Sequence, residues 1–128
     1  GSYYTDTNTF YLNANHMWDQ YVYLQVLRHE AWHAAQDCMA GNLENTMLAV
    51  IHDPSIVPQQ YKDSAQLRYR GDFARAVPWE QEAIWAGHAA MMSVNAMEVC
   101  ASGEPMWETY DPTPKTREWL VMQGYLND

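Results

Sequence analysis

Basic residues are scarce in this sequence. Only seven lysines and arginines accompany 16 aspartates and glutamates, and the formal net charge at pH 7 is −9. Because such a surface repels phosphate backbones and anionic headgroups, we expect no nucleic-acid partner. No apolar run approaches the roughly 18 residues that a membrane span needs, so we expect no membrane-spanning segment. The sequence leaves the oligomeric state open.

The sequence also gives few signs of an oxidising or extracellular setting. No basic segment followed by an apolar stretch marks a signal peptide, which favours the cytoplasm. Gly1 and Ser2 resemble a cloning scar, so a secreted protein whose leader was removed is the alternative. The two cysteines, Cys38 and Cys100, are too few for a disulfide framework. They could form one disulfide or stay reduced as small buried side chains. We favour the reduced state, because both lie in helix-like segments and a chain of this size needs no cross-link.

The remaining composition suits one globular domain. Hydrophobic residues make up 48% of the 128 positions and charged residues 18%, which is enough apolar material for a core. A chain of this length holds one domain, so we assign residues 1–128 to it. Aromatic and β-branched residues on either side of turn formers at 6–8 predict a strand, a turn and a strand over residues 3–12.

Helical periodicity predicts the other elements. Residues 16–40 contain no glycine or proline and carry apolar side chains at helical spacing, which predicts one long helix. Pro78 suits the first position of a second long helix, which we expect to reach about Ala101. Shorter helices are predicted over residues 42–51, 58–70 and 113–124. The predicted fold class is therefore α+β, mostly helical, with a small N-terminal β element.

The first long helix carries the motif that indicates chemistry. Residues 29–33 read His-Glu-Ala-Trp-His, which is the pattern H-E-x-x-H. His29 and His33 are one helical turn apart on the same face, so both imidazoles can reach a single Zn²⁺. Glu30 lies beside them and off the ligand axis, where a carboxylate can hold a metal-bound water. The competing interpretation is two core histidines with ordinary partners.

The third ligand decides the subclass. Gln36 and Met39 stand where the longer metzincin pattern would have its glycine and its third histidine, so that pattern is excluded. Glu80 and Glu82 lie at the start of the second long helix and point about 160° apart, so only one can face the metal. We expect Glu80, because its face carries small residues that permit close helix packing. Glu82 should be exposed or hydrogen-bonded elsewhere.

These segments resemble the gluzincin zinc peptidases. Residues 29–41 read H-E-A-W-H-A-A-Q-D-C-M-A-G, similar to the thermolysin-type helix H-E-x-x-H-A-x-x-D-x-x-A-G, and residues 80–83 resemble the E-x-x-A start of the glutamate helix. The resemblance implies a zincin-like domain with His29, His33 and Glu80 binding one Zn²⁺ and Glu30 as catalytic base. Many members have an aspartate where this chain has Ile84, so another group must orient His29.

The reaction that this resemblance implies is zinc-dependent hydrolysis of a peptide or protein substrate. Glu30 would take a proton from the water and pass it to the leaving amine. We expect His88 to stabilise the oxyanion, because it lies two turns beyond Glu80 on about the same face. The other candidates for this donor are Tyr61, Tyr69 and Tyr110. The substrate would dock by β-addition along an edge strand formed by Thr9, Phe10, Tyr11 and Leu12.

Two other functions use the same residues. A zincin-like domain without activity would keep zinc as a structural link in a metal-binding or protein-interaction module. A di-iron helical protein would use residues 30–33 as an E-x-x-H ligand pair, but it needs a second such pair, and the sequence has none.

Overall fold

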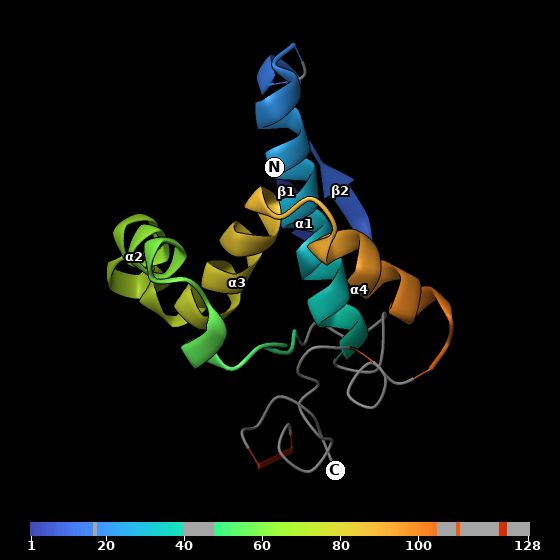
Figure 1. The fold of residues 1–128 in the computed structure, drawn as a ribbon. Helices are drawn as coiled ribbons and strands as arrows, with labels where there is room; N and C mark the ends of the chain where they lie inside the picture. Colours follow the sequence, from blue (N-terminus) through green and yellow to red (C-terminus); the bar gives the residue numbers. More distant parts are fainter. Residues whose placement is uncertain (17, 40–47, 105–109, 111–120, 123–128) are drawn as a thin grey trace.

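The computed structural model describes residues 1–16, 18–39, 48–104, 110 and 121–122 (Figure 1). Four helices and one two-stranded antiparallel sheet make up these parts, which confirms the α+β, mostly helical class. The strands are β1 (Ser2–Tyr4) and β2 (Thr9–Tyr11), and the helices are α1 (Gln20–Met39), α2 (Gln59–Arg68), α3 (Val77–His88) and α4 (Met92–Ala101). Short 3₁₀ turns occupy Ala14–His16, Pro54–Ile56 and Gly71–Ala76.

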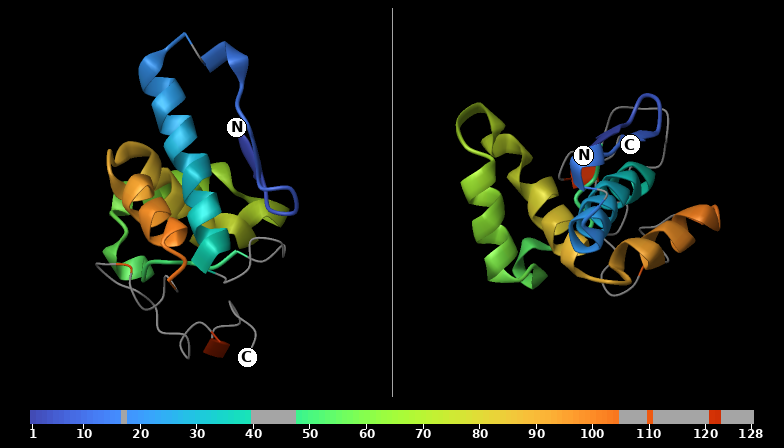
Figure 2. Two further views of the ribbon diagram at one scale, coloured as in Figure 1. Left: turned by 90° about the vertical axis from the view of Figure 1, so that its right-hand side faces the viewer. Right: turned by 90° about the horizontal axis from the view of Figure 1, so that it is seen from above.

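Helix α1 contacts more of the other elements than any other helix described. It packs against α3, α4 and β1, and α2 packs against the far side of α3. Seen from above, α1 lies between α3 and α4 (Figure 2). The helix begins at Gln20 and not at residue 16, because the Asp19 side chain accepts hydrogen bonds from the backbone N–H groups of Tyr21 and Val22, at 3.0 and 3.2 Å.

The second long helix predicted from Pro78 to Ala101 is wrong as a single element. The chain leaves helical geometry at Ala89, where φ is −110° and ψ is 119°, and α4 begins at Met92. Neither glycine nor proline causes this break. The Ser93 hydroxyl instead donates to the Arg28 carbonyl at 2.7 Å, so packing of α4 on α1 redirects the chain. Residues 48–51 of the expected helix over 42–51 are not helical, and residues 40–47 and most of 113–124 lie outside the described residues.

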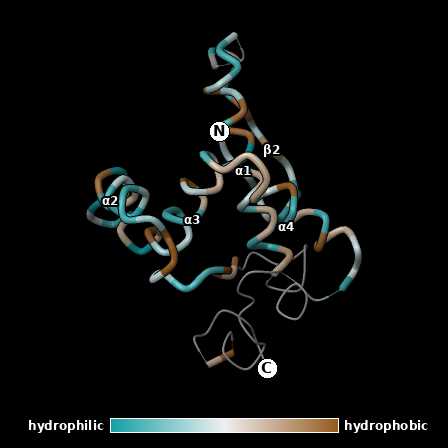
Figure 3. Tube along the Cα trace, viewed as in Figure 1, coloured by the Kyte–Doolittle hydropathy of each residue, from teal (hydrophilic) through white to brown (hydrophobic). Residues whose placement is uncertain are grey.

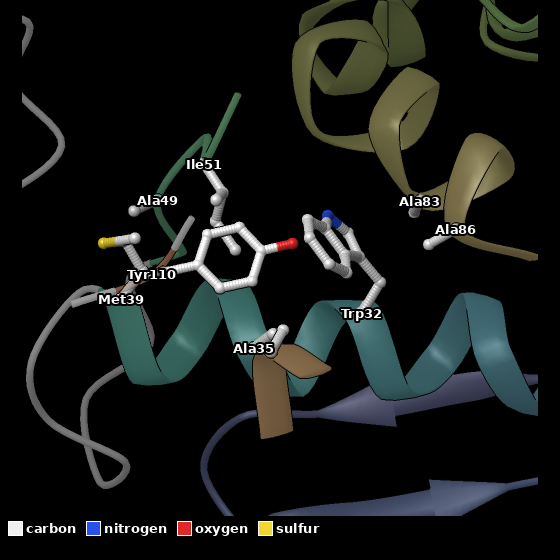
Figure 4. Packing of buried hydrophobic residues seen from close by; sticks show 9 residues of the cluster. Trp32, Ala35, Met39, Ala49, Ile51, Ala83, Ala86 and Tyr110 are labelled. Carbon is white, nitrogen blue, oxygen red and sulfur yellow. The ribbon is translucent and has the colours of Figure 1, made fainter. Parts of the chain in front are cut away.

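The core forms where α1 faces α3, α4 and the segment after residue 48. Its members are apolar and buried (Figure 4): Trp32, Ala35, Met39, Ala49, Ile51, Ala83, Ala86, Ala96 and Tyr110.

Figure 3 shows hydrophobic and hydrophilic positions interleaved along α1 and α2. Among the helices described, none is both long and apolar enough to cross a membrane.

A buried carboxylate joins three parts of this core. Glu82 of α3 is fully buried, accepts from Trp32 Nε1 of α1 at 2.8 Å, and accepts from the Ile51 backbone N–H at 2.9 Å. Burial raises the pKa of Glu82 to about 8, although the hydrogen bonds from Trp32 and the backbone oppose this rise. Glu82 is therefore hydrogen-bonded away from the candidate metal ligands, as expected, and largely protonated at neutral pH.

The N-terminal hairpin is anchored to α1 by a polar contact. Ser2 pairs with Tyr11, and Tyr4 with Thr9, in the antiparallel register. The Tyr3 hydroxyl donates to Asp37 at 3.0 Å, and Asp37 is fully buried. Burial raises the pKa of Asp37 to about 6, against the effect of the Tyr3 hydrogen bond. This contact fixes the hairpin one turn beyond His33.

The expectation of two reduced cysteines is also wrong. Cys38 near the end of α1 and Cys100 near the end of α4 form a disulfide, with their Cα atoms 6.0 Å apart. Both residues do lie in helices, as expected. The packing of α4 against α1, which the single-helix prediction missed, brings them together.

Glu82 makes the stability of the metal-free protein depend on pH. Its folded pKa of about 8 lies above the ordinary 4.5, so the folded state binds the extra proton between these values. The contribution of Glu82 to the free energy of unfolding is therefore complete below about pH 4.5, and it is lost as the pH rises toward 8. Glu82→Gln removes the titrating group, so the urea unfolding free energy of this variant should fall less than that of the wild type between pH 5 and 8. If the unfolding free energies of the wild type and Glu82→Gln changed equally with pH, this prediction would be contradicted. Glu98→Gln, at an exposed position of α4, is the control.

The disulfide closes a loop with a sequence separation of 62 residues. Loop closure of this length stabilises a folded state by about 4 kcal/mol, and native bridges usually contribute about 2–5 kcal/mol. The double variant Cys38→Ala, Cys100→Ala should lose an amount in this range in urea unfolding, and reductant should have no further effect on it. Two thiols that react in the untreated native wild type would show that the bridge is not formed.

Candidate metal centre

Three side chains converge between α1 and α3. His29 Nε2 lies 2.9 Å from Glu80 Oε2, and His33 Nε2 lies 3.2 Å from Glu80 Oε1. The imidazole rings are 5.0 Å apart between centroids, as expected for positions one turn apart. One potential ligand atom from each residue lies within 4.8 Å of the others, so the group can hold a metal ion. Two imidazoles and a carboxylate match the donor set of catalytic zinc sites.

Small residues on α3 permit this approach. Gly87 lies so close to α1 that a Cβ atom there would be 3.0 Å from the Gln25 carbonyl oxygen and 3.6 Å from the His29 Cβ. Ala83, one turn closer to Glu80, is fully buried. The two helices can therefore pack closely enough for the short side chain of a glutamate on α3 to reach both histidines of α1.

The electrostatics of the three side chains reinforce each other. Burial alone would raise the pKa of Glu80, but its hydrogen bonds with His29 and His33 and their charges outweigh burial and hold that pKa well below the usual range. Burial likewise opposes the charged form of His33, yet contact with Glu80 raises its pKa. Tyr69 donates from its hydroxyl to Glu80 Oε2 at 2.9 Å. Glu80 is thus ionised, as a ligand must be.

Gln36 orients one of the histidines. A proton on His33 Nδ1 donates to Gln36 Oε1 at 2.8 Å, which leaves Nε2 directed at Glu80. The amide of Gln36 in turn donates to the Trp79 carbonyl at 3.0 Å, next to Glu80 in sequence. This residue was considered only as a mismatch to the metzincin pattern. Its spacing of three from His33, on the same helical face, was the signal that it could support the ligand.

Glu30 lies beside the ligands but is not one of them. It is 6% exposed and lines a pocket of about 180 Å³ together with His29, Tyr69 and residues of α1, α2 and α3. Ile84, which stands in place of the family's aspartate, lines the same pocket. A Cβ at Gly1 would lie 3.2 Å from both Glu30 Cγ and the Tyr11 carbonyl, so the end of β2 is near this pocket.

The candidates for the oxyanion donor are widely separated. Tyr69 lies at the cluster through its contact with Glu80. His88 is exposed at the end of α3, where its ring stacks on Tyr61 at 5.3 Å, and the structure does not bring it to the ligands. Tyr110 packs in the core against Trp32, at 6.2 Å between ring centroids. Thr9, Phe10 and Tyr11 form β2 as expected, whereas Leu12 follows the strand.

Comparisons of the chain with protein-family models, curated proteins and solved structures found no match.

The three ligands predict a specific pattern of metal loss. Wild-type protein purified without a chelating column should bind one Zn²⁺ per chain, measured by elemental analysis and by competition with a chromophoric chelator. Removing a ligand in His33→Ala or Glu80→Ala should weaken zinc binding by far more than the roughly 10–100-fold that follows loss of a supporting residue. His88→Ala is the matched control and should bind as the wild type does. Equal affinities in all four proteins would exclude this site.

Proposed function

We propose that this protein is a zinc-dependent peptidase. The observation that supports this most directly is the position of Glu30. It lines the pocket next to His29, it takes no part in the three-ligand group, and it is adjacent in sequence to a ligand. A site that only needed a structural ion would have no use for a carboxylate in that place. The arrangement suits a base that acts on a water and not on the ion.

In this proposal the candidate ligands, the general base and the oxyanion donor are different residues. His29, His33 and Glu80 would hold a Zn²⁺ ion, which would supply Lewis acidity to the peptide carbonyl and to a water. Glu30 accepts the proton of the attacking water and returns it to the leaving amine. We assign the oxyanion donor to Tyr69 in place of His88. The Tyr69 hydroxyl donates to Glu80 Oε2, so this role requires that hydrogen bond to break and the proton to turn to the oxyanion. Burial and the charge of Glu80 raise the pKa of Tyr69, with Arg68 opposing, so its hydroxyl keeps its proton.

The pocket constrains how a substrate binds. Its volume of about 180 Å³ is below the roughly 300–1,000 Å³ of typical ligand pockets, so it has room for about one side chain. The rest of a peptide would extend along the surface. Within the described residues β2 pairs only with β1, and its Tyr11 end lies near the pocket. We therefore keep the proposal that an extended peptide adds to β2.

The alternative function is a metal-binding module without catalysis. The small pocket favours it, because little substrate surface can be buried there. In such a module the ion would link α1 to α3, and removing it would lower stability without affecting any reaction.

The disulfide bears on the compartment. Disulfides persist in oxidising environments and are rare in reducing cytosol. The bridge between Cys38 and Cys100 therefore supports a protein that works in an oxidising compartment, in place of the cytoplasm favoured from the sequence.

A single substitution distinguishes these functions. Glu30→Gln should retain zinc and lose peptide hydrolysis by about 10²–10⁴-fold, the usual contribution of a general base. The assay uses internally quenched peptides and elemental analysis of the same samples, with exposed Glu98→Gln as the control. Zinc without hydrolysis in the wild type would favour the non-catalytic module. Loss of zinc in Glu30→Gln as complete as in His33→Ala would make Glu30 a ligand, as in the di-iron alternative.

A further inference from the structure

An arginine lies on the wall of the pocket beside the ligands. Arg68 is the last residue of α2, and it lines the pocket opposite the α1 residues Gln25, Val26 and Glu30. In a chain of net charge −9 with only seven basic residues, a cation at this position is unexpected from composition. The other basic side chains that the structure describes do not line this pocket.

The backbone of Arg68 is fixed relative to the ligand group. Its neighbour Tyr69 donates to Glu80 Oε2 at 2.9 Å, and the Tyr69 backbone N–H donates to the Ala65 carbonyl at 2.9 Å, which closes the last turn of α2. Helix α2 itself packs against α3, which carries Glu80. The guanidinium is therefore attached to a part of the chain that the site already positions.

The guanidinium is also available. Across the described parts of the chain, the ion pairs are those of Glu80 with the two histidines, and Arg68 takes part in none. Its side chain is exposed. An arginine presents several N–H donors in a planar fork that fits a carboxylate, and it keeps its charge at every working pH.

We propose that Arg68 determines substrate specificity by binding a carboxylate that the peptide carries next to the cleaved bond. This inference rests on the proposed function. The pocket has room for about one residue, and Arg68 is the arginine on its wall, so the residue that enters should be acidic or should end in a free carboxylate. An acidic side chain and a free carboxyl terminus both present a carboxylate to the guanidinium.

Binding to a variant that does not hydrolyse tests the inference directly. In the zinc-loaded Glu30→Gln background, blocked alanine hexapeptides with one central glutamate or glutamine are titrated by tryptophan fluorescence. The glutamate peptide should bind about tenfold more tightly, as a charge-assisted hydrogen bond provides, and adding Arg68→Gln should remove the preference. Adding Arg70→Gln, an exposed arginine outside the pocket, should leave it intact. To test a free carboxyl terminus as the carboxylate, the glutamine peptide with a free carboxyl terminus is compared with the same peptide ending in an amide.

The possible results separate this inference from the proposed function. Equal binding of all peptides, or a preference that Arg68→Gln retains, overturns the role of Arg68 even where the wild type hydrolyses peptides. A preference that depends on Arg68 supports it even where no hydrolysis is found. In active wild type, Arg68→Gln should raise KM for the glutamate peptide about tenfold and leave kcat nearly unchanged, because the arginine acts on binding alone.

Discussion

The close contact between the N-terminal half of α3 and the middle of α1 is the constraint on which the structure depends. Two carboxyl groups of that half reach α1, and their surroundings give them different charge states. Glu80 meets two histidines and is ionised, while Glu82 lies fully buried against Trp32 and is mostly neutral. Positions two apart on a helix point in nearly opposite directions. Residues two apart on α3 therefore supply both a candidate metal ligand and the hydrogen-bond acceptor that joins the core.

Much of the candidate site could be predicted because the face on which a helical residue lies follows from its position in the sequence. H-E-x-x-H places His29 and His33 on one face wherever the helix lies, and the choice of Glu80 over Glu82 followed from helix phase and residue size. The structure groups these three residues as a possible metal site, and what that site does remains our proposal. The small β element was predictable for the same reason, since its turn and strands are contiguous in sequence.

What the sequence did not reveal depends on tertiary packing. Helices α3 and α4 separate at Ala89 without a breaker, because α4 must fold back onto α1. That same packing joins Cys38 to Cys100, so one missed turn produced two wrong expectations. Gln36 and Tyr69 reach the ligands through contacts that no periodicity contains. His88 shares a face with Glu80 in projection, but the eight residues of helix between them rise about 12 Å, which is too far.

The disulfide determines what a cut in the chain would do to the candidate metal site. Cys38 lies after both histidine ligands, and Cys100 lies after Glu80, so the covalent ring encloses α2, α3 and most of α4. A cut at any bond within that ring leaves two fragments that remain bonded to each other. The piece bearing Glu80 would stay tethered to α1 at high effective concentration. The nicked, two-chain form would therefore keep all three candidate ligands in one molecule.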